Sequence, residues 1–352
     1  MVTIAVISFR LGGGDGVSIE ATKWIAALRS LGHTVRTVAG EGPVDHLVPG
    51  LALHAATPPR ATELDAALDG ALDGALDGAD LVIVENLLSL PLNLGARDAL
   101  TELLRGRPAL LHHHDLPWQR EHLAHLDGPA DDARWTHVTI NEQSRIELAA
   151  RGIRAEVVRN RFDCDPPAGA RELTRALLGV GATPLALCPV RAIGRKNLTG
   201  ALRLAEQLGT ALWLLGPAED GYDDELERVL DGAEVPVLRG MPARSTIHDA
   251  YAACDLVIMA STWEGFGNPV LESVTHRRPL ALNRYPVALE LLDFGFSFAS
   301  LEDLDELRRE LASPNIAKRD ANLAVARAHF ALDGLADVLK SLLHRHFGEL
   351  DL

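Results

Sequence analysis

A short strand, a glycine turn and a helix start follow one another between residues 255 and 275, and this order constrains the fold more than any other stretch. The run 255–260, Asp-Leu-Val-Ile-Met-Ala, is short and apolar, as expected of a buried parallel strand. Gly265 and Gly267 form the turn, and Asn268-Pro269 is a favourable N-cap and first helical residue. Units of this kind predict a parallel sheet covered by helices.

Two glutamates, Glu264 and Glu272, flank this turn with seven residues between them. The start of a helix offers unpaired N–H groups and a positive dipole end, which favour an anion. Carboxylates beside such a site are suited to accept hydrogen bonds from hydroxyls on the molecule that carries the anion. Phosphate plus hydroxyls describes a nucleotide sugar. In the alternative interpretation, Glu272 only stabilises the helix, because its negative charge lies near the positive N-terminal end, and Glu264 is a solvated turn residue.

The composition indicates a soluble globular chain of 352 residues, long enough for two domains, with 47% apolar and 24% charged residues. A net charge of −15 argues against nucleic acid and against electrostatic docking on an anionic membrane. Cys164, Cys188 and Cys254 lie far apart, without metal or disulfide spacing. With no signal peptide and no run of membrane-spanning length, we expect a cytoplasmic protein.

Strand and helix patterns alternate along the chain. Residues 2–8 read as a strand, 11–16 as a glycine turn, 18–31 as a helix and 33–38 as the next strand. A dinucleotide fingerprint counted from Gly12 and Gly14 would require glycine where Val17 stands, which argues against an NAD enzyme. The pattern continues with helices at 198–208 and 245–253 and with strands at 80–84, 108–111, 185–189, 211–215, 235–238 and 279–283, the last closing the second sheet. Two doubly wound parallel sheets are predicted.

Residues 67–78 repeat the sequence Ala-Leu-Asp-Gly three times. Leu68, Leu72 and Leu76 recur at helical spacing, but each glycine weakens a helix by about 1 kcal/mol. We interpret the repeat as a low-complexity extension of a surface helix, without a function of its own.

Three histidines, His112 to His114, follow the strand predicted at 108–111. Alternation along an extended chain places His112 and His114 on one face and His113 on the other, so at most two of them can share a metal. A contact with a sugar, ordinary packing and a metal site are the three interpretations left open by the residues alone.

Two motifs carry a resemblance to a known family. Residues 263–272, Trp-Glu-Gly-Phe-Gly-Asn-Pro-Val-Leu-Glu, resemble the signature of retaining glycosyltransferases of family 4. Residues 189–197, Pro-Val-Arg-Ala-Ile-Gly-Arg-Lys-Asn, resemble the loop with which that family holds the donor diphosphate. The resemblance implies an α/β chain of GT-B fold, with two doubly wound parallel-sheet Rossmann-like lobes facing a central cleft.

The resemblance also implies a domain organisation. Residues 1–160 are expected to form the acceptor-side domain and residues 165–325 the nucleotide-sugar-binding domain. A C-terminal helix at about 330–352 is expected to pack back on the first domain.

Site residues are carried over position by position. The catalytic set is Arg191 and Lys196 on the diphosphate, Glu264 on the sugar hydroxyls, and His114 on the donor sugar, with His113 as second choice. The donor-binding set, in which Glu272 holds the ribose, is Gly13, Gly14, Arg239, Met241, Gly265, Phe266, Gly267, Asn268 and Glu272. The residues expected to contact the acceptor are Asp15, Asn86, His113 and Trp118.

The function implied is retaining transfer of a sugar from a UDP- or GDP-linked donor to a hydroxyl of a hydrophilic sugar or small molecule. No cofactor and no metal are expected, because an arginine and a lysine neutralise the diphosphate. Two alternatives are a sugar-nucleotide epimerase of the same two-lobed fold and a non-catalytic nucleotide-sugar-binding protein. The epimerase would need an acid/base pair near the sugar and no second substrate.

Overall fold

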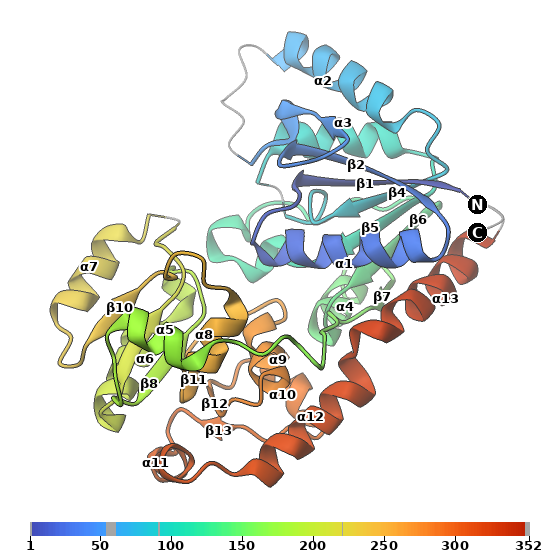
Figure 1. Ribbon diagram of the computed structural model, residues 1–352. Coiled ribbons are helices and arrows are strands. Elements are labelled where there is room, and N and C mark those ends of the chain that lie inside the picture. The colour runs from blue at the N-terminus through green and yellow to red at the C-terminus, as the bar shows by residue number, and fades with distance from the viewer. Residues whose placement is uncertain (1, 54–60, 91, 220, 349–352) are drawn as a thin grey trace. The chain divides into compact units, whose positions relative to one another are not determined.

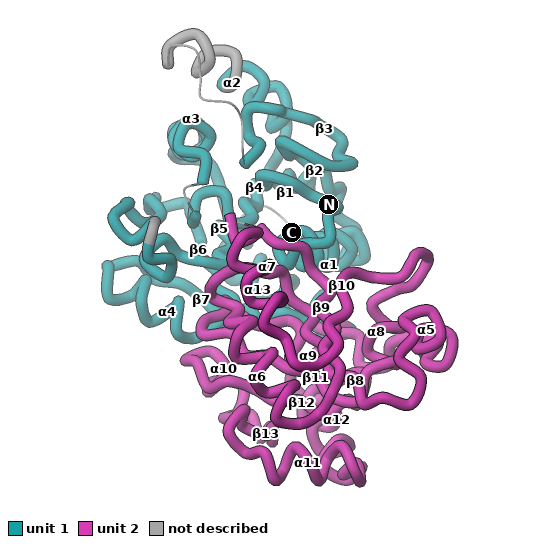
Figure 2. The backbone as a smooth tube through the Cα atoms, turned by 90° about the vertical axis from the view of Figure 1, so that its left-hand side faces the viewer, with its two compact units in different colours: residues 1–161, 333–352 teal, residues 162–332 magenta. Residues whose placement is uncertain are grey.

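The computed structural model describes residues 2–53, 61–90, 92–219 and 221–348. It divides the chain into two compact units (Figure 2). Unit 1 comprises Met1–Arg161 with Asp333–Leu352, and unit 2 comprises Phe162–Leu332. Each unit is a parallel sheet with helices packed on it (Figure 1).

Unit 1 contains a seven-stranded sheet in the order β3-β2-β1-β4-β5-β6-β7, in which every neighbouring pair is parallel. Its strands are β1 (Thr3–Arg10), β2 (Thr34–Glu41), β3 (His46–Leu47), β4 (Leu81–Glu85), β5 (Ala109–His113), β6 (Trp135–Thr139) and β7 (Ala155–Val157). The central strands are apolar and buried on both faces, as parallel sheets require.

The helices of unit 1 cover both faces of this sheet, with α2 and α3 on one face and α1 on the other (Figure 1). The helix α13, from the C-terminal part of the chain, packs on α1. The Asp15 side chain caps α1 by accepting a hydrogen bond from the Ser18 amide. These helices are α1 (Gly16–Ser30), α2 (Ala61–Leu76), α3 (Leu94–Leu104), α4 (Glu142–Ala149) and α13 (Leu335–Phe347).

Unit 2 contains a six-stranded parallel sheet in the order β10-β9-β8-β11-β12-β13. Its strands are β8 (Leu185–Cys188), β9 (Ala211–Leu214), β10 (Val237–Arg239), β11 (Leu256–Met259), β12 (Leu280–Leu282) and β13 (Ala299–Ser300). The prediction that residues 279–283 close this sheet is wrong, because β13 pairs with β12 and forms the edge.

The helices of unit 2 begin and end at recognisable local signals. Gly179 and Gly209 end α5 and α6 in the left-handed conformation, and Thr246 forms a capping box with Asp249 at the start of α8. The helices are α5 (Arg171–Leu178), α6 (Leu198–Leu208), α7 (Asp223–Asp231), α8 (Ile247–Ala253), α9 (Asn268–Thr275), α10 (Pro286–Asp293), α11 (Leu304–Ala312) and α12 (Ile316–Phe330).

The strand order has the same consequence in both units. The chain leaves β1 in one direction for β2 and β3 and in the other for β4 onward, and β8 is flanked in the same way by β9 and β11. The predicted fold class, α/β with two doubly wound parallel sheets, is confirmed. Such sheets bind ligands outside the carboxyl ends of the strands, where the order reverses. Ligand sites are therefore expected at the loops after β1 and β4 and at those after β8 and β11.

The Ala-Leu-Asp-Gly repeat lies largely within α2, and its apolar face is part of the core. Leu72 and Leu76 are fully buried and belong to the same cluster as Val82 and Leu100. The side chain of Leu68 lies outside the described residues. The repeat is therefore more than an extension of a surface helix, because its leucines supply core contacts to unit 1.

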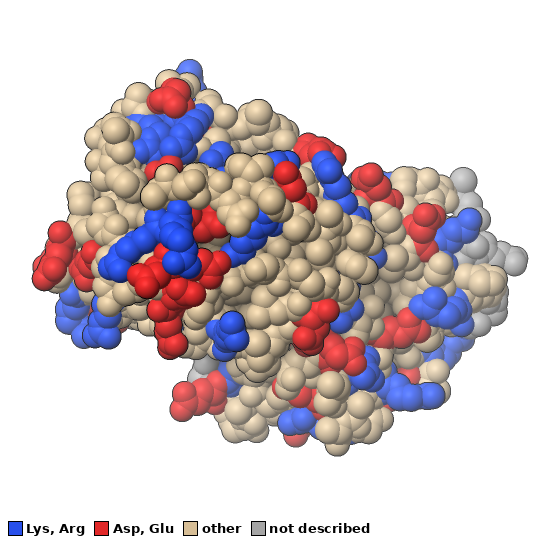
Figure 3. All heavy atoms as spheres, turned by 90° about the horizontal axis from the view of Figure 1, so that it is seen from below, with Lys and Arg blue, Asp and Glu red and all other residues tan. Residues whose placement is uncertain are grey.

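The surface carries both signs of charge despite the net charge of −15, and acidic and basic side chains are interspersed on the face shown in Figure 3. Within the described part of the chain, no helix combines the length and apolar character needed to cross a membrane. Cys164, Cys188 and Cys254 are free thiols and all are buried.

Candidate active site

Two loops at the switch point of unit 2 bring Lys196 and Glu264 together. Lys196 ends a short 3₁₀ turn after β8, and Glu264 lies in the loop after β11, the neighbouring strand. Lys196 Nζ lies 2.5 Å from Glu264 Oε1, and Arg195 Nη1 lies 2.8 Å from Glu264 Oε2. Lys196 and Glu264 keep only 8% and 5% of their surface exposed. The Glu264 carboxylate therefore holds two cations at the carboxyl ends of the strands.

The ionisation of this pair follows from its burial. Burial by itself would raise the pKa of Glu264, but Lys196 and Arg195 outweigh it and hold the pKa below its ordinary value. Burial also lowers the pKa of Lys196, although Glu264 opposes this effect. The 2.5 Å contact therefore joins a buried carboxylate to an ammonium, and both groups are positioned before any ligand arrives.

The turn after Glu264 is held in place by aromatic side chains that pack against it. Gly267 has φ +85°, and a Cβ at this position would lie 2.6 Å from Tyr285 Oη, so only glycine fits without strain. Phe266 is buried and its ring packs near Phe162 and Phe330, with centroids 6.0 and 6.2 Å away. The packing of the Phe266 ring with these two rings thus holds the loop in place.

The helix α9 begins one residue earlier than the sequence predicts. Gly267 is its N-cap and Asn268 its first residue, so the prediction of Asn268 as the cap is wrong. The left-handed conformation of Gly267 starts the helical turn at this point. Residues 265–268 therefore form the turn that leads into α9, and the positive N-terminal end of this helix lies beside Glu264.

Glu272 lies one turn into α9 and has a partner that the motif did not reveal. Tyr251 Oη, from α8, donates a hydrogen bond of 2.7 Å to Glu272 Oε2. The Tyr251 ring is fully buried and stacks on His276 at 4.5 Å between centroids. Tyr251 thereby fixes one oxygen of the Glu272 carboxylate.

The other predicted donor residues of unit 2 lie at the carboxyl ends of β8 and β10. Arg191 is half-exposed, forms an ion pair of 2.6 Å with Glu219, and interacts electrostatically with Lys196. Arg239 ends β10 and pairs with Glu227 at 2.7 Å, and Met241 follows it after one glycine. The structure brings Arg191 near Lys196 but gives Arg239 a partner on α7.

In unit 1, the glycine loop after β1 requires glycine at Gly12. It has φ +74°, and a Cβ there would lie 2.7 Å from Pro43. A Cβ on Gly13 would meet Asp15 Oδ2 at 3.1 Å, and one on Gly14 would have no neighbour within 4 Å. Asp15 caps α1 and pairs with Arg10 at 2.9 Å. Gly14 therefore leaves room at the switch point of unit 1.

Glu85, His112 and His114 meet at the ends of β4 and β5. Glu85 Oε2 lies 2.9 Å from His112 Nδ1 and 2.8 Å from His114 Nε2. Burial alone would raise the pKa of Glu85, but the two imidazoles lower it to about 2. Within the described chain this is the set of donor groups close enough to hold a metal ion, with the atoms within 4.8 Å of one another.

Asn86 orients the backbone that carries His114. Its φ of +61° is unusual for a non-glycine residue, and its Oδ1 accepts hydrogen bonds from the amides of His114 and Asp115 at 3.0 and 3.1 Å. The Asn86 oxygen is therefore used within the chain, where it holds the loop after β5.

His113 and Trp118 are engaged away from His114. His113 points to the opposite face of β5, as alternation predicts, where its ring nitrogens contact Ser89 and His137 at 2.5 and 2.9 Å. Trp118 Nε1 donates to Glu147 at 2.7 Å, and the Arg151 guanidinium lies over its ring. The structure thus does not place His113 and His114 in one site.

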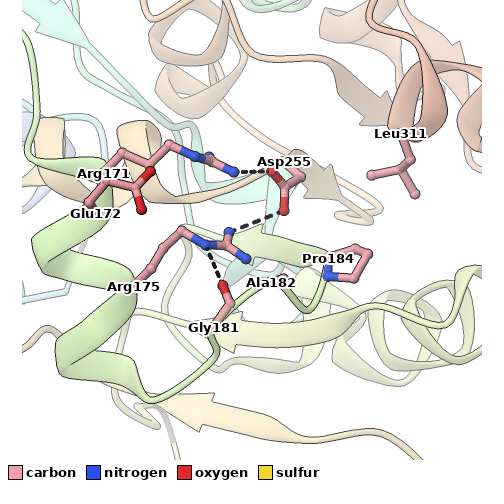
Figure 4. Close-up of a pocket in the computed structure, with 8 residues that line it drawn as sticks. All are labelled: Arg171, Glu172, Arg175, Gly181, Ala182, Pro184, Asp255 and Leu311. Carbon is pink, nitrogen blue, oxygen red and sulfur yellow. Dashed lines mark hydrogen bonds and ion pairs between the residues drawn. The ribbon is translucent and has the colours of Figure 1, made fainter.

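A hollow of about 540 Å³ in unit 2 lies at the opposite end of β11 from Glu264. It is bordered by Arg171 and Arg175 of α5, which converge on Asp255, the residue before β11 (Figure 4). Arg171 Nη2 lies 2.5 Å from Asp255 Oδ1, and Arg175 Nη1 lies 3.2 Å from Oδ2. Both guanidiniums also donate to backbone carbonyls, so this hollow is bounded by a clamp that holds α5 to the sheet.

Comparison with known proteins identifies the class. Residues 195–308, which include Lys196, Glu264 and Glu272, match the family described as "Glycosyl transferases group 1". Mannosylglucosylglycerate synthase of Thermotoga maritima is 28% identical over 96% of this chain and 98% of its own length. The protein of that name from Petrotoga mobilis is 24% identical, with 89% of each chain covered. This protein is a GT-B glycosyltransferase.

Solved structures show the same fold for the whole glycosyltransferase. HepE of Anabaena, in complex with UDP and glucose, matches with a TM-score of 0.74 at 18% identity, covering 98% of this chain and 100% of that one. Sucrose-phosphate synthase of Thermosynechococcus elongatus matches with a TM-score of 0.73 at 16% identity, covering 99% and 100%. The two-unit architecture is therefore that of GT-B enzymes throughout.

Sequence reasoning missed four side chains that the glycosyltransferase places at these loops: Arg195, Tyr251, Tyr285 and Glu85. Arg195 stands directly beside Lys196, which was a signal that could have been used. The other three lie 18 to 29 positions of sequence from the residues that they neighbour, and a motif search does not show such proximity.

Proposed function

We propose that this glycosyltransferase transfers a sugar, with retention, from a UDP- or GDP-linked donor to a hydroxyl of a small hydrophilic glycoside. The observation that carries the proposal is the buried Lys196–Glu264 pair at the switch point between β8 and β11. A switch point is where a doubly wound sheet binds nucleotides. A lysine at this point supplies the charge that a diphosphate requires.

Lys196 and Arg191 are proposed to hold the diphosphate of the donor. Negative charge grows on this leaving group as the glycosidic bond breaks, and cations positioned in advance stabilise it. Arg195 is proposed to keep the Glu264 carboxylate in place, so that Lys196 can share its charge with the phosphates. Because these side chains neutralise the diphosphate, the transfer is proposed to proceed without a metal at that position.

Glu264 and His114 are proposed to contact the donor sugar, and Glu272 to bind the ribose in the orientation set by Tyr251. The transition state is expected to resemble an oxocarbenium ion, as in glycoside hydrolysis. Arg239, Met241 and the turn from Gly265 to Asn268 complete the proposed nucleotide site, and Gly13 and Gly14 the approach from unit 1. No separate nucleophile is needed in the front-face mechanism proposed for retaining enzymes of this type.

The proposed acceptor class follows from the relatives, two of which are named for making mannosylglucosylglycerate. That product joins sugars to glycerate, so the matching acceptor for this chain is a small hydrophilic glycoside. Asp15 and Asn86, in the loops after β1 and β4, are the proposed polar contacts of unit 1. The Asn86 oxygen already accepts from the amides of His114 and Asp115, so its amide nitrogen is the group proposed to contact the acceptor.

Thermal stabilisation by nucleotides tests the donor site. The full chain is melted alone and with UDP, GDP or ADP at about 100 times the dissociation constant, which should add roughly 2.7 kcal/mol of stability. The expected result is a shift with UDP or GDP that Lys196→Ala removes and that Lys340→Ala retains, since the Lys340 side chain is exposed on α13. No shift with any nucleotide, or an equal shift in Lys196→Ala, contradicts the proposed donor site.

A further inference from the structure

Glu85, His112 and His114 share one side of the sheet in unit 1. Glu85 ends β4 and pairs in register with His112 on β5. His114 follows two positions later, so it returns to the same face, and the two imidazole centroids are 4.4 Å apart. The pleat of two adjacent strands therefore brings two imidazoles and a carboxylate together without any loop rearrangement.

The donor atoms lie close to the positions that a tetrahedral metal requires. Ligands about 2.0–2.2 Å from a zinc ion lie roughly 3.3 Å from one another. The observed separations from Glu85 Oε2 are 2.9 Å to His112 Nδ1 and 2.8 Å to His114 Nε2. All three donor atoms lie within 4.8 Å of one another, so side-chain shifts of at most about 1.5 Å would admit the ion.

The surroundings leave several buried polar atoms unused. Glu85 Oε1, on the same carboxylate as the proposed ligand oxygen, finds no hydrogen-bond partner among the described residues, although the side chain is fully buried. Glu20 Oε2, on the buried face of α1, also has no hydrogen-bond partner among the described residues. The Glu20 carboxyl interacts electrostatically with His114 and Glu85. Buried polar atoms without partners are uncommon and call for an explanation such as a bound ion.

The rings are held in place before any metal binds. Trp24 of α1 stacks on His112 with 4.1 Å between centroids, and the Asn86 side chain fixes the backbone of His114. A ligand set fixed by packing and hydrogen bonds loses little entropy on coordination.

We propose that Glu85, His112 and His114 form a binding site for a divalent transition metal of the Zn²⁺ class, with Glu20 as the fourth ligand. Two imidazoles with carboxylate suit Zn²⁺ or Co²⁺ better than Mg²⁺ or Ca²⁺, which prefer oxygen ligands alone. The ion takes the places of the N–H protons that the two rings donate to Glu85. It fixes the ends of β4 and β5 and the ring of His114.

The proposed metal ligands are different residues from those proposed on the donor diphosphate. The ion uses Nε2 of His114, so the proposed sugar contact of this ring falls to Nδ1, and metal occupancy does not depend on the proposed transfer. Metal binding is therefore measured directly rather than through activity. Failure of the nucleotide experiment would leave the metal result unaffected, and the reverse also holds.

The test is a Co²⁺ titration of the full chain after treatment with a chelator and removal of the chelator. We expect one Co²⁺ per chain, visible d–d absorption without a thiolate band, and displacement by one equivalent of Zn²⁺. His112→Gln and Glu85→Gln should weaken binding at least about 100-fold. The matched control is His248→Gln, which alters an imidazole pair in unit 2, 2.9 Å apart, that has no carboxylate ligand.

A second variant keeps the test decisive if the glutamine variants do not fold. His112→Cys retains a ligand, and it should add a thiolate-to-Co²⁺ charge-transfer band that the folded wild-type chain, whose three cysteines are buried, lacks. The proposal is overturned if the wild-type chain takes up no stoichiometric metal. It is also overturned if His112→Gln binds as tightly as wild type, or if His112→Cys binds Co²⁺ without the new band.

Discussion

Lys196 Nζ lies 2.5 Å from Glu264 Oε1, although 68 positions of sequence separate the two residues. The contact exists because β8 and β11 are neighbours in the sheet while β9 and β10 lie to the other side of β8. Each loop leaves the carboxyl end of its own strand, so the topology itself places the two charges together. A doubly wound strand order thus converts two distant motifs into one site.

Removing either charge should impair transfer as well as stability. Lys196→Ala takes away a cation positioned at the leaving group, and loss of one such group typically costs about 10²- to 10³-fold in turnover. Glu264→Ala should reduce turnover similarly, since Lys196 loses its anchor. Steady-state turnover with the donor nucleotide sugar identified by the melting experiment is the measurement.

Folding needs its own control, because one charge of a buried pair left alone destabilises by about 3–5 kcal/mol. The double variant Lys196→Met with Glu264→Gln removes both charges and should recover most of that stability without recovering activity. Activity in the double variant close to wild type would show that the pair is only structural.

Nucleotide affinity should fall at alkaline pH, earlier than for an ordinary lysine. Burial lowers the pKa of Lys196 despite Glu264, so its positive charge disappears as pH rises through that lowered value. Dissociation constants measured from pH 7 upward should rise before the usual lysine range. In Lys196→Arg the guanidinium keeps its charge, so any affinity that remains should stay constant over the same range.

The Glu264 carboxylate of the same pair makes the stability of the protein depend on pH in the acid range, where stability should fall as the pH falls. Because the folded pKa of Glu264 is held below its ordinary value, its stabilising contribution is present above that ordinary value. The contribution is lost as pH falls through the lowered pKa. Urea unfolding of Glu264→Gln should show a shallower loss of stability in that range, and identical acid profiles would contradict the assignment.

The sequence predicts the elements of this fold well where local signals are strong. The helix expected at 198–208 is α6 with the same bounds, because asparagine caps its start and Gly209 ends it. The edge strand β13 was missed, since two residues, Ala299 and Ser300, leave no periodic pattern. The N-cap of α9 was misplaced because neither the left-handed conformation of Gly267 nor the nearby Tyr285, which leaves no room for a Cβ there, is visible in the sequence.

The site was predictable as a set of motifs but not as a set of contacts. The two motifs indicate Lys196 and Glu264 separately, and only the strand order pairs them. Tyr251 lies in an ordinary amphipathic helix, so nothing local reveals that its hydroxyl reaches Glu272. Alternation separated His113 from His114 correctly, because it depends on strand geometry alone.

Tyr251→Phe should weaken nucleotide binding without harming the fold. Phenylalanine keeps the buried ring but removes the hydrogen bond to Glu272 Oε2. A hydrogen bond to a charged group is worth about 1.5–3 kcal/mol, so a dissociation constant roughly tenfold or more higher is expected. Calorimetric titration with the nucleotide measures it. An unchanged constant would remove Glu272 from the proposed ribose site.

Two glycine substitutions should change stability in opposite directions. Gly267→Ala forces a side chain into φ +85° against Tyr285 and should lower the free energy of unfolding by about 1–3 kcal/mol. Gly74→Ala, in the last turn of α2 with no atom within 4 Å of the new Cβ, should raise it by up to about 1 kcal/mol. Denaturant unfolding of both variants checks the pair, and equal destabilisation would contradict the described geometry of α2.

The arginine-lined hollow of unit 2 should prove structural rather than functional. Asp255→Asn removes the charge on which Arg171 and Arg175 converge and weakens the backbone contact that Asp255 Oδ2 makes with the Leu185 amide. Loss of such partly buried bonds should lower the free energy of unfolding by about 1–3 kcal/mol. Asp255 precedes β11 and Glu264 follows it, so the two residues lie at opposite ends of this strand. Nucleotide affinity in Asp255→Asn should therefore stay at the wild-type value. A tenfold loss of affinity in a folded Asp255→Asn variant would instead make this end of the sheet part of the ligand site.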